Sequence, residues 1–227
     1  MSLILNIDTA TETGHVSIAK DGVVLHDMFN DQQKNHAGFL QPAIKQVLAD
    51  SEILIHEIDA VAVTEGPGSY TGIRIGIASA KGLSYALNKP LIVINTLEVM
   101  AKSAIQQLQV QLSFNDKALL CPMIDARRME VFTAVYDILL TNILQPSAVI
   151  LDISSFKSLL NEHFVNFFGS GSKKWKGECN HKNAFFTEIN ITAPALSSLS
   201  VNKFNQNLFT NVAYSEPLYI KEFYINT

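Results

Sequence analysis

The sequence predicts an α/β fold built as two lobes, each with a mixed β-sheet flanked by helices. The first hundred residues show three consecutive strand patterns followed by alternating helix and strand patterns, which is typical of a mixed sheet covered by helices. A second group of strand patterns begins near Ala101. The 227 residues, 48% of them hydrophobic, are enough to give two small lobes a core each.

The first lobe is expected to begin with a buried strand and a hairpin. Residues 3–7 form a short apolar run that ends at Asp8, as in a central strand. Residues 15–19 and 23–27 flank Asp21-Gly22, a strong hairpin signal because such turns need positive φ angles.

Helices and strands then alternate. The spacing of Leu40, Ile44 and Val47 predicts a helix over residues 35–50, whose start Asn35 can cap. The remaining elements expected in this lobe are a strand over 59–64, a helix over 70–87 and a strand over 91–95. The resulting order, β-β-β-α-β-α-β, matches the ribonuclease-H-like lobe of the two-lobed actin-like (ASKHA) fold.

The second half shows weaker patterns. Residues 118–124 and 130–136 are expected to pair around Asp125-Ala126-Arg127-Arg128, to which we assign only the role of a turn. The other expected elements are a strand over 149–153, a helix over 153–162, a strand over 165–168, a closing helix over 202–211 and an extended tail over 217–220. We therefore place the first lobe at residues 1–100, completed by 202–227, and a smaller, degenerate second lobe at 101–201.

The helix predicted over residues 70–87 has one unusually bare face. Gly72, Gly76 and Ala80 fall at positions i, i+4 and i+8, so they lie on the same side. A glycine inside a helix costs roughly 1 kcal/mol relative to alanine, so two in one stripe indicate that close packing offsets the cost. Two interpretations stay open. Either a partner's backbone contacts this stripe, or the stripe packs on the protein's own sheet and Ile73 and Ile77 belong to the core.

Composition excludes several classes of function. The formal net charge of −4 and the absence of a Lys/Arg run argue against direct nucleic-acid binding by the chain as a whole, although an average can hide a local patch. Cys121 and Cys179 are expected to be free thiols in a reducing cytoplasm. No apolar run reaches the roughly 18–20 residues of a membrane span, and the start lacks the pattern of a signal peptide. These observations predict a cytoplasmic protein.

Three stretches resemble the TsaB family, also called YeaZ. They are Ile7-Asp8-Thr9-Ala10-Thr11, Gly66-Pro67-Gly68-Ser69-Tyr70-Thr71-Gly72-Ile73-Arg74-Ile75-Gly76, and the tail Pro217-Leu218-Tyr219-Ile220. The second stretch is highly specific to this family. The resemblance is close through about residue 137 and looser until the tail.

The resemblance implies a role in making threonylcarbamoyladenosine on tRNA. In that family the catalytic paralogue TsaD transfers the threonylcarbamoyl group, and TsaB is its non-catalytic scaffold and activating partner. The small ATPase TsaE joins the complex. Without TsaD a homodimer is expected, and tRNA is expected to be contacted only indirectly through the complex.

Neither a metal nor a cofactor is expected. TsaD-like proteins place two histidines four residues apart on the first helix, whereas here His36 is followed at i+4 by Leu40, which offers no lone pair. Asp8 and Thr9 occupy the place of a phosphate-binding turn and are interpreted as a weak, vestigial nucleotide site; Gly169-Ser170-Gly171 resembles the corresponding second loop. The alternative is a small nucleotide-dependent transferase or metallohydrolase of the actin-like superfamily.

The expected partner interface draws on both first-lobe helices. Arg74 and Lys81 either pair with partner carboxylates or are solvated charges. A Gly76→Arg variant is expected to block complex formation and leave the monomer folded; unfolding would instead assign the stripe to the core. The interface residues predicted are His36, Leu40, Ile44, Tyr70, Gly72, Ile73, Arg74, Gly76, Ile77 and Ala80.

Overall fold

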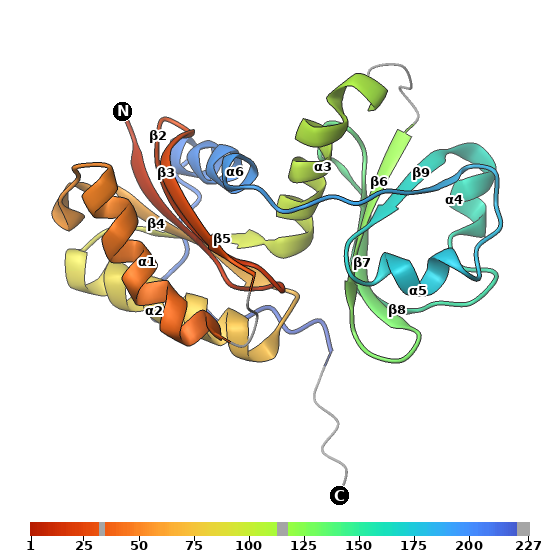
Figure 1. The fold of residues 1–227 in the computed structure, drawn as a ribbon, viewed down its shortest axis with the longest axis horizontal. Coiled ribbons are helices and arrows are strands. Elements are labelled where there is room, and N and C mark those ends of the chain that lie inside the picture. The colour runs from red at the N-terminus through yellow and green to blue at the C-terminus, as the bar shows by residue number, and fades with distance from the viewer. Residues whose placement is uncertain (32–34, 113–117, 222–227) are drawn as a thin grey trace, which may run out of the picture. The chain divides into compact units, whose positions relative to one another are not determined.

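The computed structural model describes residues 1–31, 35–112 and 118–221 and divides into two compact units (Figure 1). The first unit comprises Met1–Val99 and Thr192–Leu218, and the second comprises Met100–Ile191 and Tyr219–Thr227. Residues 222–227, which the sequence analysis assigned to the first lobe, lie outside the described residues.

A five-stranded mixed sheet forms the centre of the first unit. Its central strand β1 pairs antiparallel with β2 and parallel with β4. The predicted hairpin at Asp21-Gly22 is confirmed: the two residues have φ angles of 49° and 82° and join β2 to its antiparallel neighbour β3. The strands in spatial order are β3 (Val23–Asn30), β2 (Gly14–Lys20), β1 (Leu3–Asp8), β4 (Ala60–Gly66) and β5 (Leu91–Asn95).

Helices cover both faces of this sheet (Figure 1). Helices α1 (His36–Asp50) and α2 (Tyr70–Leu87) lie on one face and together contact all five strands, and α6 (Ala193–Asn205) lies on the other face and contacts β1, β2, β3 and β5. A short 3-10 helix, η2 (Ile55–Glu57), precedes β4. Among the described residues, Asn35 holds the N-cap position of α1 but makes no side-chain capping hydrogen bond, so the predicted cap is wrong.

The second unit repeats the strand order of the first. Two antiparallel pairings, β6 with β7 and β7 with β8, are followed by two parallel pairings, β6 with β9 and β9 with β10. The predicted class, a two-lobed actin-like fold of mixed sheets flanked by helices, is thereby confirmed. Its elements are β6 (Ala118–Asp125), β7 (Glu130–Tyr136), β8 (Asn142–Ile150), α4 (Lys157–Glu162), β9 (Phe164–Phe168), α5 (Ser172–Lys176) and β10 (Ala184–Phe186).

Several predicted elements differ from the structure. Helix α3 (Thr96–Leu112) was not predicted, because β5 ends at Asn95 and the helix begins at the next residue, with no turn residue between them. A strand was predicted over 149–153, whereas β8 starts earlier and ends at Ile150. A helix was predicted over 153–162, whereas α4 begins only at Lys157. The closing helix predicted over 202–211 is α6, which starts at Ala193, where the Thr192 side chain accepts a hydrogen bond from the Ala195 amide.

Each unit has its own hydrophobic core. In the second unit Trp175 packs edge-on against Phe156 and Phe167, with ring centroids 5.3 and 4.7 Å away. Burial raises the pKa of the Cys121 thiol to about 12, as expected of a structural cysteine. No helix in the described part of the chain is both long and apolar enough to cross a bilayer.

Candidate functional site: the α1–α2 helix pair and the end of β1

The glycine stripe of α2 faces the protein's own sheet. A Cβ atom on Gly72 would lie 2.0 Å from the carbonyl oxygen of Thr9, and one on Gly76 would lie 2.4 Å from the Thr9 hydroxyl oxygen. The Thr9 hydroxyl also donates a 2.7 Å hydrogen bond to the carbonyl oxygen of Gly72. The backbone that approaches this stripe is therefore the residue that follows β1.

Most of the predicted interface residues are buried on the inner sides of the two helices. Ile73, Ile77 and Ala80 belong to the first unit's core, as do Leu40 and Ile44. His36 is buried as well, and its Nε2 atom lies 3.0 Å from the carbonyl oxygen of Thr11. Of the ten predicted residues, the structure exposes Tyr70 and Arg74 and buries His36, Leu40, Ile44, Gly72, Ile73, Gly76, Ile77 and Ala80.

The end of β1 is a buried polar cluster. One carboxylate oxygen of Asp8 accepts hydrogen bonds from the Thr64 hydroxyl at 2.7 Å and from the Ala10 amide at 2.9 Å. Its other oxygen, Oδ2, is buried and has no hydrogen-bond partner among the described residues. Burial lowers the pKa of nearby His15 despite the opposing fields of Asp8 and Asp27, so the imidazole is held neutral.

Both residues of the predicted nucleotide site make internal contacts. Asp8 and Thr9 are both fully buried, and Thr9 uses its hydroxyl to hold α2. Leu40, at the position where a second metal-binding histidine would have to be, lies in the core. Within the described residues, no three histidine, cysteine or carboxylate side chains gather in a way that could hold a metal ion.

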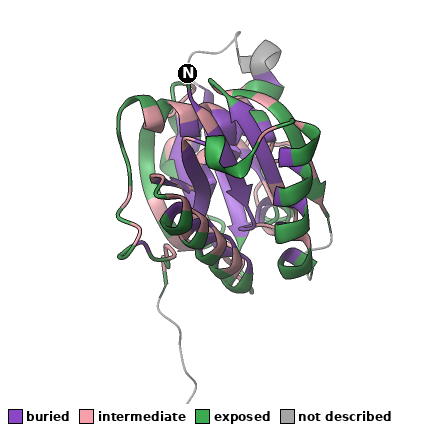
Figure 2. Ribbon diagram, turned by 90° about the vertical axis from the view of Figure 1, so that its left-hand side faces the viewer, coloured by how far each residue is buried: buried purple, intermediate pink, exposed green. Residues whose placement is uncertain are grey.

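The outward sides of α1 and α2 carry few charges. Figure 2 shows the strands as buried and the helices around them as exposed on their outer sides. Gln41 of α1 donates a 3.2 Å hydrogen bond to Ser79 of α2, which links the two helices at the surface. We call the exposed residues of the pair the outer helix face: Ala37, Gly38, Gln41, Pro42, Lys45, Gln46, Ala49 and Asp50 of α1, and Tyr70, Thr71, Arg74, Ala78, Gly82, Tyr85 and Ala86 of α2.

Small and aromatic side chains dominate the α2 part of this face. Tyr70, Arg74, Ala78 and Gly82 recur every four residues and so form one stripe. The Arg74 guanidinium lies 3.8 Å above the Tyr70 ring centroid, a cation–π contact, and a Cβ on Gly82 would meet nothing within 4 Å. Ala78 and Gly82 were not among the predicted interface residues, although they show the same four-residue spacing as the buried stripe.

Lys81 binds the C-terminal tail. Its ammonium group donates hydrogen bonds to the carbonyl oxygens of Ser215 at 2.7 Å and Ala213 at 3.3 Å. The Leu218 amide then donates to the carbonyl oxygen of Glu65 at 2.8 Å. The structure thus gives Lys81 an intramolecular role that neither of its predicted roles included.

Replacing Lys81 with alanine is expected to loosen this tail. The two carbonyl oxygens would lose a charged donor, a change that costs about 1 kcal/mol at a partly exposed site. We expect residues 211–218 to exchange amide hydrogens faster in Lys81→Ala than in the unsubstituted chain. The matched control is Lys89→Ala, just beyond the end of α2, where exchange of the tail should not change; equal exchange in both variants would contradict the role of Lys81.

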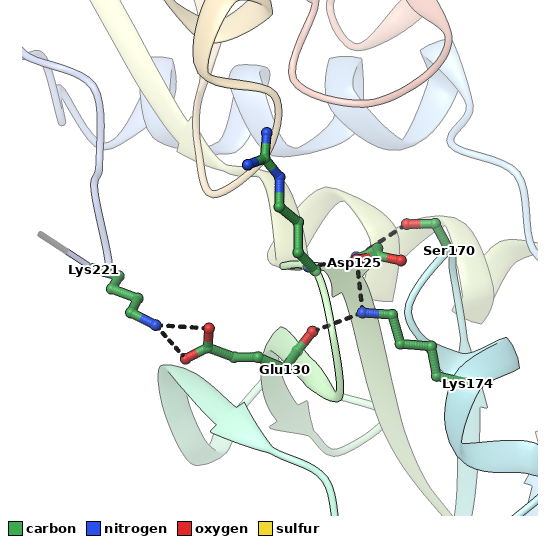
Figure 3. A network of polar contacts seen from close by, with 6 residues as sticks. Asp125, Glu130, Ser170, Lys174 and Lys221 are labelled. Carbon is green, nitrogen blue, oxygen red and sulfur yellow. Dashed lines mark hydrogen bonds and ion pairs between the residues drawn. The ribbon is translucent and has the colours of Figure 1, made fainter. Parts of the chain in front are cut away.

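A polar network joins the β6–β7 turn to α5 in the second unit (Figure 3). Lys174 bridges the turn, with its ammonium nitrogen 2.7 Å from an Asp125 carboxylate oxygen and 3.0 Å from the Glu130 carbonyl oxygen. The Glu130 carboxylate accepts from Lys221 at 2.8 Å, and the Ser170 hydroxyl accepts from the Asp125 amide at 3.1 Å. Partial burial would raise the pKa of Asp125, but hydrogen bonds from Lys174 and the Arg127 amide hold it below its ordinary value.

Comparison with known families finds one match over most of the chain. The family described as "TsaD: tRNA N6-adenosine threonylcarbamoyltransferase" matches residues 24–213. The chain is 32% identical over 133 residues to "tRNA threonylcarbamoyladenosine biosynthesis protein TsaB" of Bacillus subtilis, and 37% identical over 133 residues to the protein of the same description in Escherichia coli. Each alignment covers 59% of this chain and 54% of the relative, so the matched part spans about half the length of these relatives.

Solved structures agree on the fold. "YeaZ from Pseudomonas aeruginosa" superposes with a TM-score of 0.78 at 22% identity, covering 96% of this chain and 100% of that one. A second structure, "an uncharacterized protein with similarity to peptidase YEAZ from Pseudomonas aeruginosa", gives a TM-score of 0.80 at 22% identity over 97% of this chain. Together with the curated relatives, these matches confirm the resemblance to TsaB (YeaZ) that the sequence motifs predicted.

Proposed function

The chain belongs to the TsaD family of tRNA threonylcarbamoyladenosine biosynthesis, and from that premise we propose that it is a non-catalytic partner of a TsaD-type transferase. In this proposal it activates the transferase by binding it through the outer helix face. Without that partner, two copies of the chain associate through the same face.

The composition of the outer helix face supports this proposal most directly. Three of its fifteen residues, Lys45, Asp50 and Arg74, are charged, whereas a helix face that only meets water is typically rich in charge. Interfaces are depleted in charged residues at their centre and enriched in tyrosine and arginine. Tyr70 and Tyr85, exposed by 38% and 84%, fit that composition.

The geometry also favours helix-to-helix contact. Ala78 and Gly82 are small residues one turn apart on α2, and a Cβ on Gly82 would meet nothing within 4 Å, so the backbone of a second helix can approach closely there. A paralogue with the same fold would present an equivalent helix pair, so the contact would contain four helices. Because the same patch serves the homodimer and the heterodimer, the two associations compete.

The rival function is a small nucleotide-dependent transferase or metallohydrolase. The buried Oδ2 atom of Asp8, which has no hydrogen-bond partner in the part of the chain that the structure describes, favours this function. Against it, Thr9 and Leu40 are used for internal packing. An enzyme of this class would bind ATP or a divalent cation as the isolated chain, whereas the scaffold needs neither.

Light scattering after size-exclusion chromatography tests the proposal. The chain alone is expected to elute as a homodimer, and adding the TsaD protein of the same organism should replace it with a one-to-one heterocomplex. TsaE with ATP is expected to add to that complex. A chain that stays a homodimer beside TsaD, with or without TsaE and ATP, would refute the scaffold function.

A further inference from the structure

The tip of the β6–β7 hairpin holds two arginines in an unfavourable backbone conformation. Arg127 and Arg128 have φ angles of 71° and 49°, both in the left-handed region that asparagine and glycine adopt more readily. They are two of the three arginines in the chain, and both are exposed. Because other residue types would adopt this backbone conformation more easily, the presence of two arginines here indicates a role for their side chains.

Helix α5, which carries three lysines, packs beside this turn. Lys174 binds both of its ends, at Asp125 and at the Glu130 carbonyl, so α5 is held against the hairpin. Lys173 and Lys176 occupy the same short helix, within one turn of Lys174, and both are exposed. Lys221 adds a sixth cation through its ion pair with Glu130. We call Arg127, Arg128, Lys173, Lys174, Lys176 and Lys221 the basic cluster.

The carboxylates at the two ends of the turn are paired with lysines. Asp125 pairs with Lys174 and Glu130 pairs with Lys221, whereas no ion pair between described residues involves Arg127, Arg128, Lys173 or Lys176. Six cations and two carboxylates leave a formal charge of +4, and counting Glu178, two residues beyond α5, and Asp152, whose carbonyl oxygen accepts from the Trp175 indole of α5, leaves +2. The whole chain, by contrast, carries a charge of −4. This part of the second unit is therefore locally positive in a chain that is negative as a whole.

We propose that the basic cluster binds the phosphate backbone of RNA directly. Arginine guanidinium groups recognise phosphate with paired hydrogen bonds, and lysines contribute charge without demanding a fixed geometry. Four exposed cations, two on the turn and two on the helix held against it, suit several successive phosphates better than a single anion. The net charge of the chain argued against direct RNA binding, so contact with tRNA was expected only through a partner. The positive charge of the basic cluster leads us to propose direct binding instead. The inference rests on the proposed function only in that tRNA is the RNA to be bound.

Fluorescence anisotropy of the full chain with a labelled, unmodified tRNA transcript tests this proposal. Binding is expected to weaken steeply with salt, with a slope of about −3 in log affinity against log salt concentration, because each neutralised phosphate contributes about −0.9. Arg127→Asn combined with Arg128→Gly should weaken binding at least tenfold and reduce the slope by about two. Since asparagine and glycine favour this turn, the variant should remain folded.

The matched control removes two lysines from exposed or half-exposed sites of the first unit. Lys20→Gln combined with Lys89→Gln should leave the affinity for the transcript unchanged within about twofold, since neither residue belongs to the basic cluster. An equal loss in the control and in the arginine variant would overturn the proposal. Absence of salt-dependent binding by the unsubstituted chain would also overturn the proposal. Displacement of the transcript by polyglutamate at matched charge would overturn it as well, because the basic cluster would then bind an acidic protein segment.

Light scattering separates this proposal from the scaffold function. The arginine variant is expected to form the heterocomplex with TsaD normally, because the basic cluster is not part of the outer helix face. Loss of RNA binding with an intact heterocomplex supports both proposals. Failure of the unsubstituted chain to bind TsaD refutes the scaffold alone and leaves the anisotropy result standing.

Discussion

Replacing Gly72 with alanine is expected to destabilise the protein by about 3 kcal/mol, more than a typical overpacked site. The new methyl carbon would sit 2.0 Å from the carbonyl oxygen of Thr9, which is backbone and cannot turn aside. Either α2 moves away from β1 or Thr9 moves, and both changes break the hydrogen bond between the Thr9 hydroxyl and the Gly72 carbonyl. Chemical denaturation measured by circular dichroism gives the change in unfolding free energy.

Gly82→Ala is the matched control in the same helix. A methyl group there meets no atom within 4 Å, so the substitution should stabilise the protein by about 0.5–1 kcal/mol through helix propensity alone. The two variants make the same chemical change and are expected to move stability in opposite directions. Equal effects of the two substitutions would show that Gly72 does not touch Thr9 and that the stripe is free.

The same geometry changes the meaning of Gly76→Arg. From the sequence this variant was expected to stay folded and lose its partner. In the structure even a methyl group at Gly76 would lie 2.4 Å from the Thr9 hydroxyl oxygen, so an arginine would be expected to disrupt the unit itself. A substitution at Gly76 therefore tests internal packing. A test of partner binding needs a substitution on the outer helix face.

Helical spacing explains why the sequence could not choose between these outcomes. A four-residue repeat identifies the residues that share a side of a helix, but it does not say which side meets the sheet. Two stripes of α2 include small residues: one contains Gly72, Gly76 and Ala80, the other Ala78 and Gly82. The position of Thr9, next to α2 in space but far from it in sequence, decides between them.

The fold could be predicted from the sequence more completely than the site, because the sequence signals of helices and strands are local. Helix α2 has the predicted limits: the Ser69 hydroxyl accepts a hydrogen bond from the Gly72 amide at its start, and Asn88 adopts a left-handed conformation, with φ of 51°, at its end. Helix α6 was misplaced because its buried face includes Ser197 and Ser200, and buried serines are absent from a pattern of apolar residues. The Ser197 hydroxyl accepts a hydrogen bond from the Asn6 side chain, which is 191 residues away in the sequence. A pattern of neighbouring residues cannot reveal such a contact.

Ala78→Glu is expected to abolish binding to TsaD and to the second copy while leaving the monomer as stable as before. Ala78 is exposed, so the new side chain reaches water in the free chain, and Arg74 one turn away can pair with it for a few tenths of a kcal/mol. In a four-helix contact the carboxylate would instead be buried where backbones approach closely, with a desolvation cost that the contact does not repay. We expect at least a hundredfold loss of affinity, about 3 kcal/mol, in calorimetric titration with TsaD.

Two controls make this result specific to the outer helix face. Asp137→Ala changes the charge by one unit in the opposite sense, at a turn of the second unit, and should leave association unchanged. The unfolding free energy of Ala78→Glu should equal that of the unsubstituted chain within about 0.5 kcal/mol, as for most surface substitutions. Full affinity in Ala78→Glu would refute docking through this face even if a heterocomplex forms, and the contact would then have to lie elsewhere on the chain. We expect Ala78→Glu to lose affinity but not stability, and Gly72→Ala to lose stability. Together these results would show that one side of α2 stabilises the fold and the other side binds the partner.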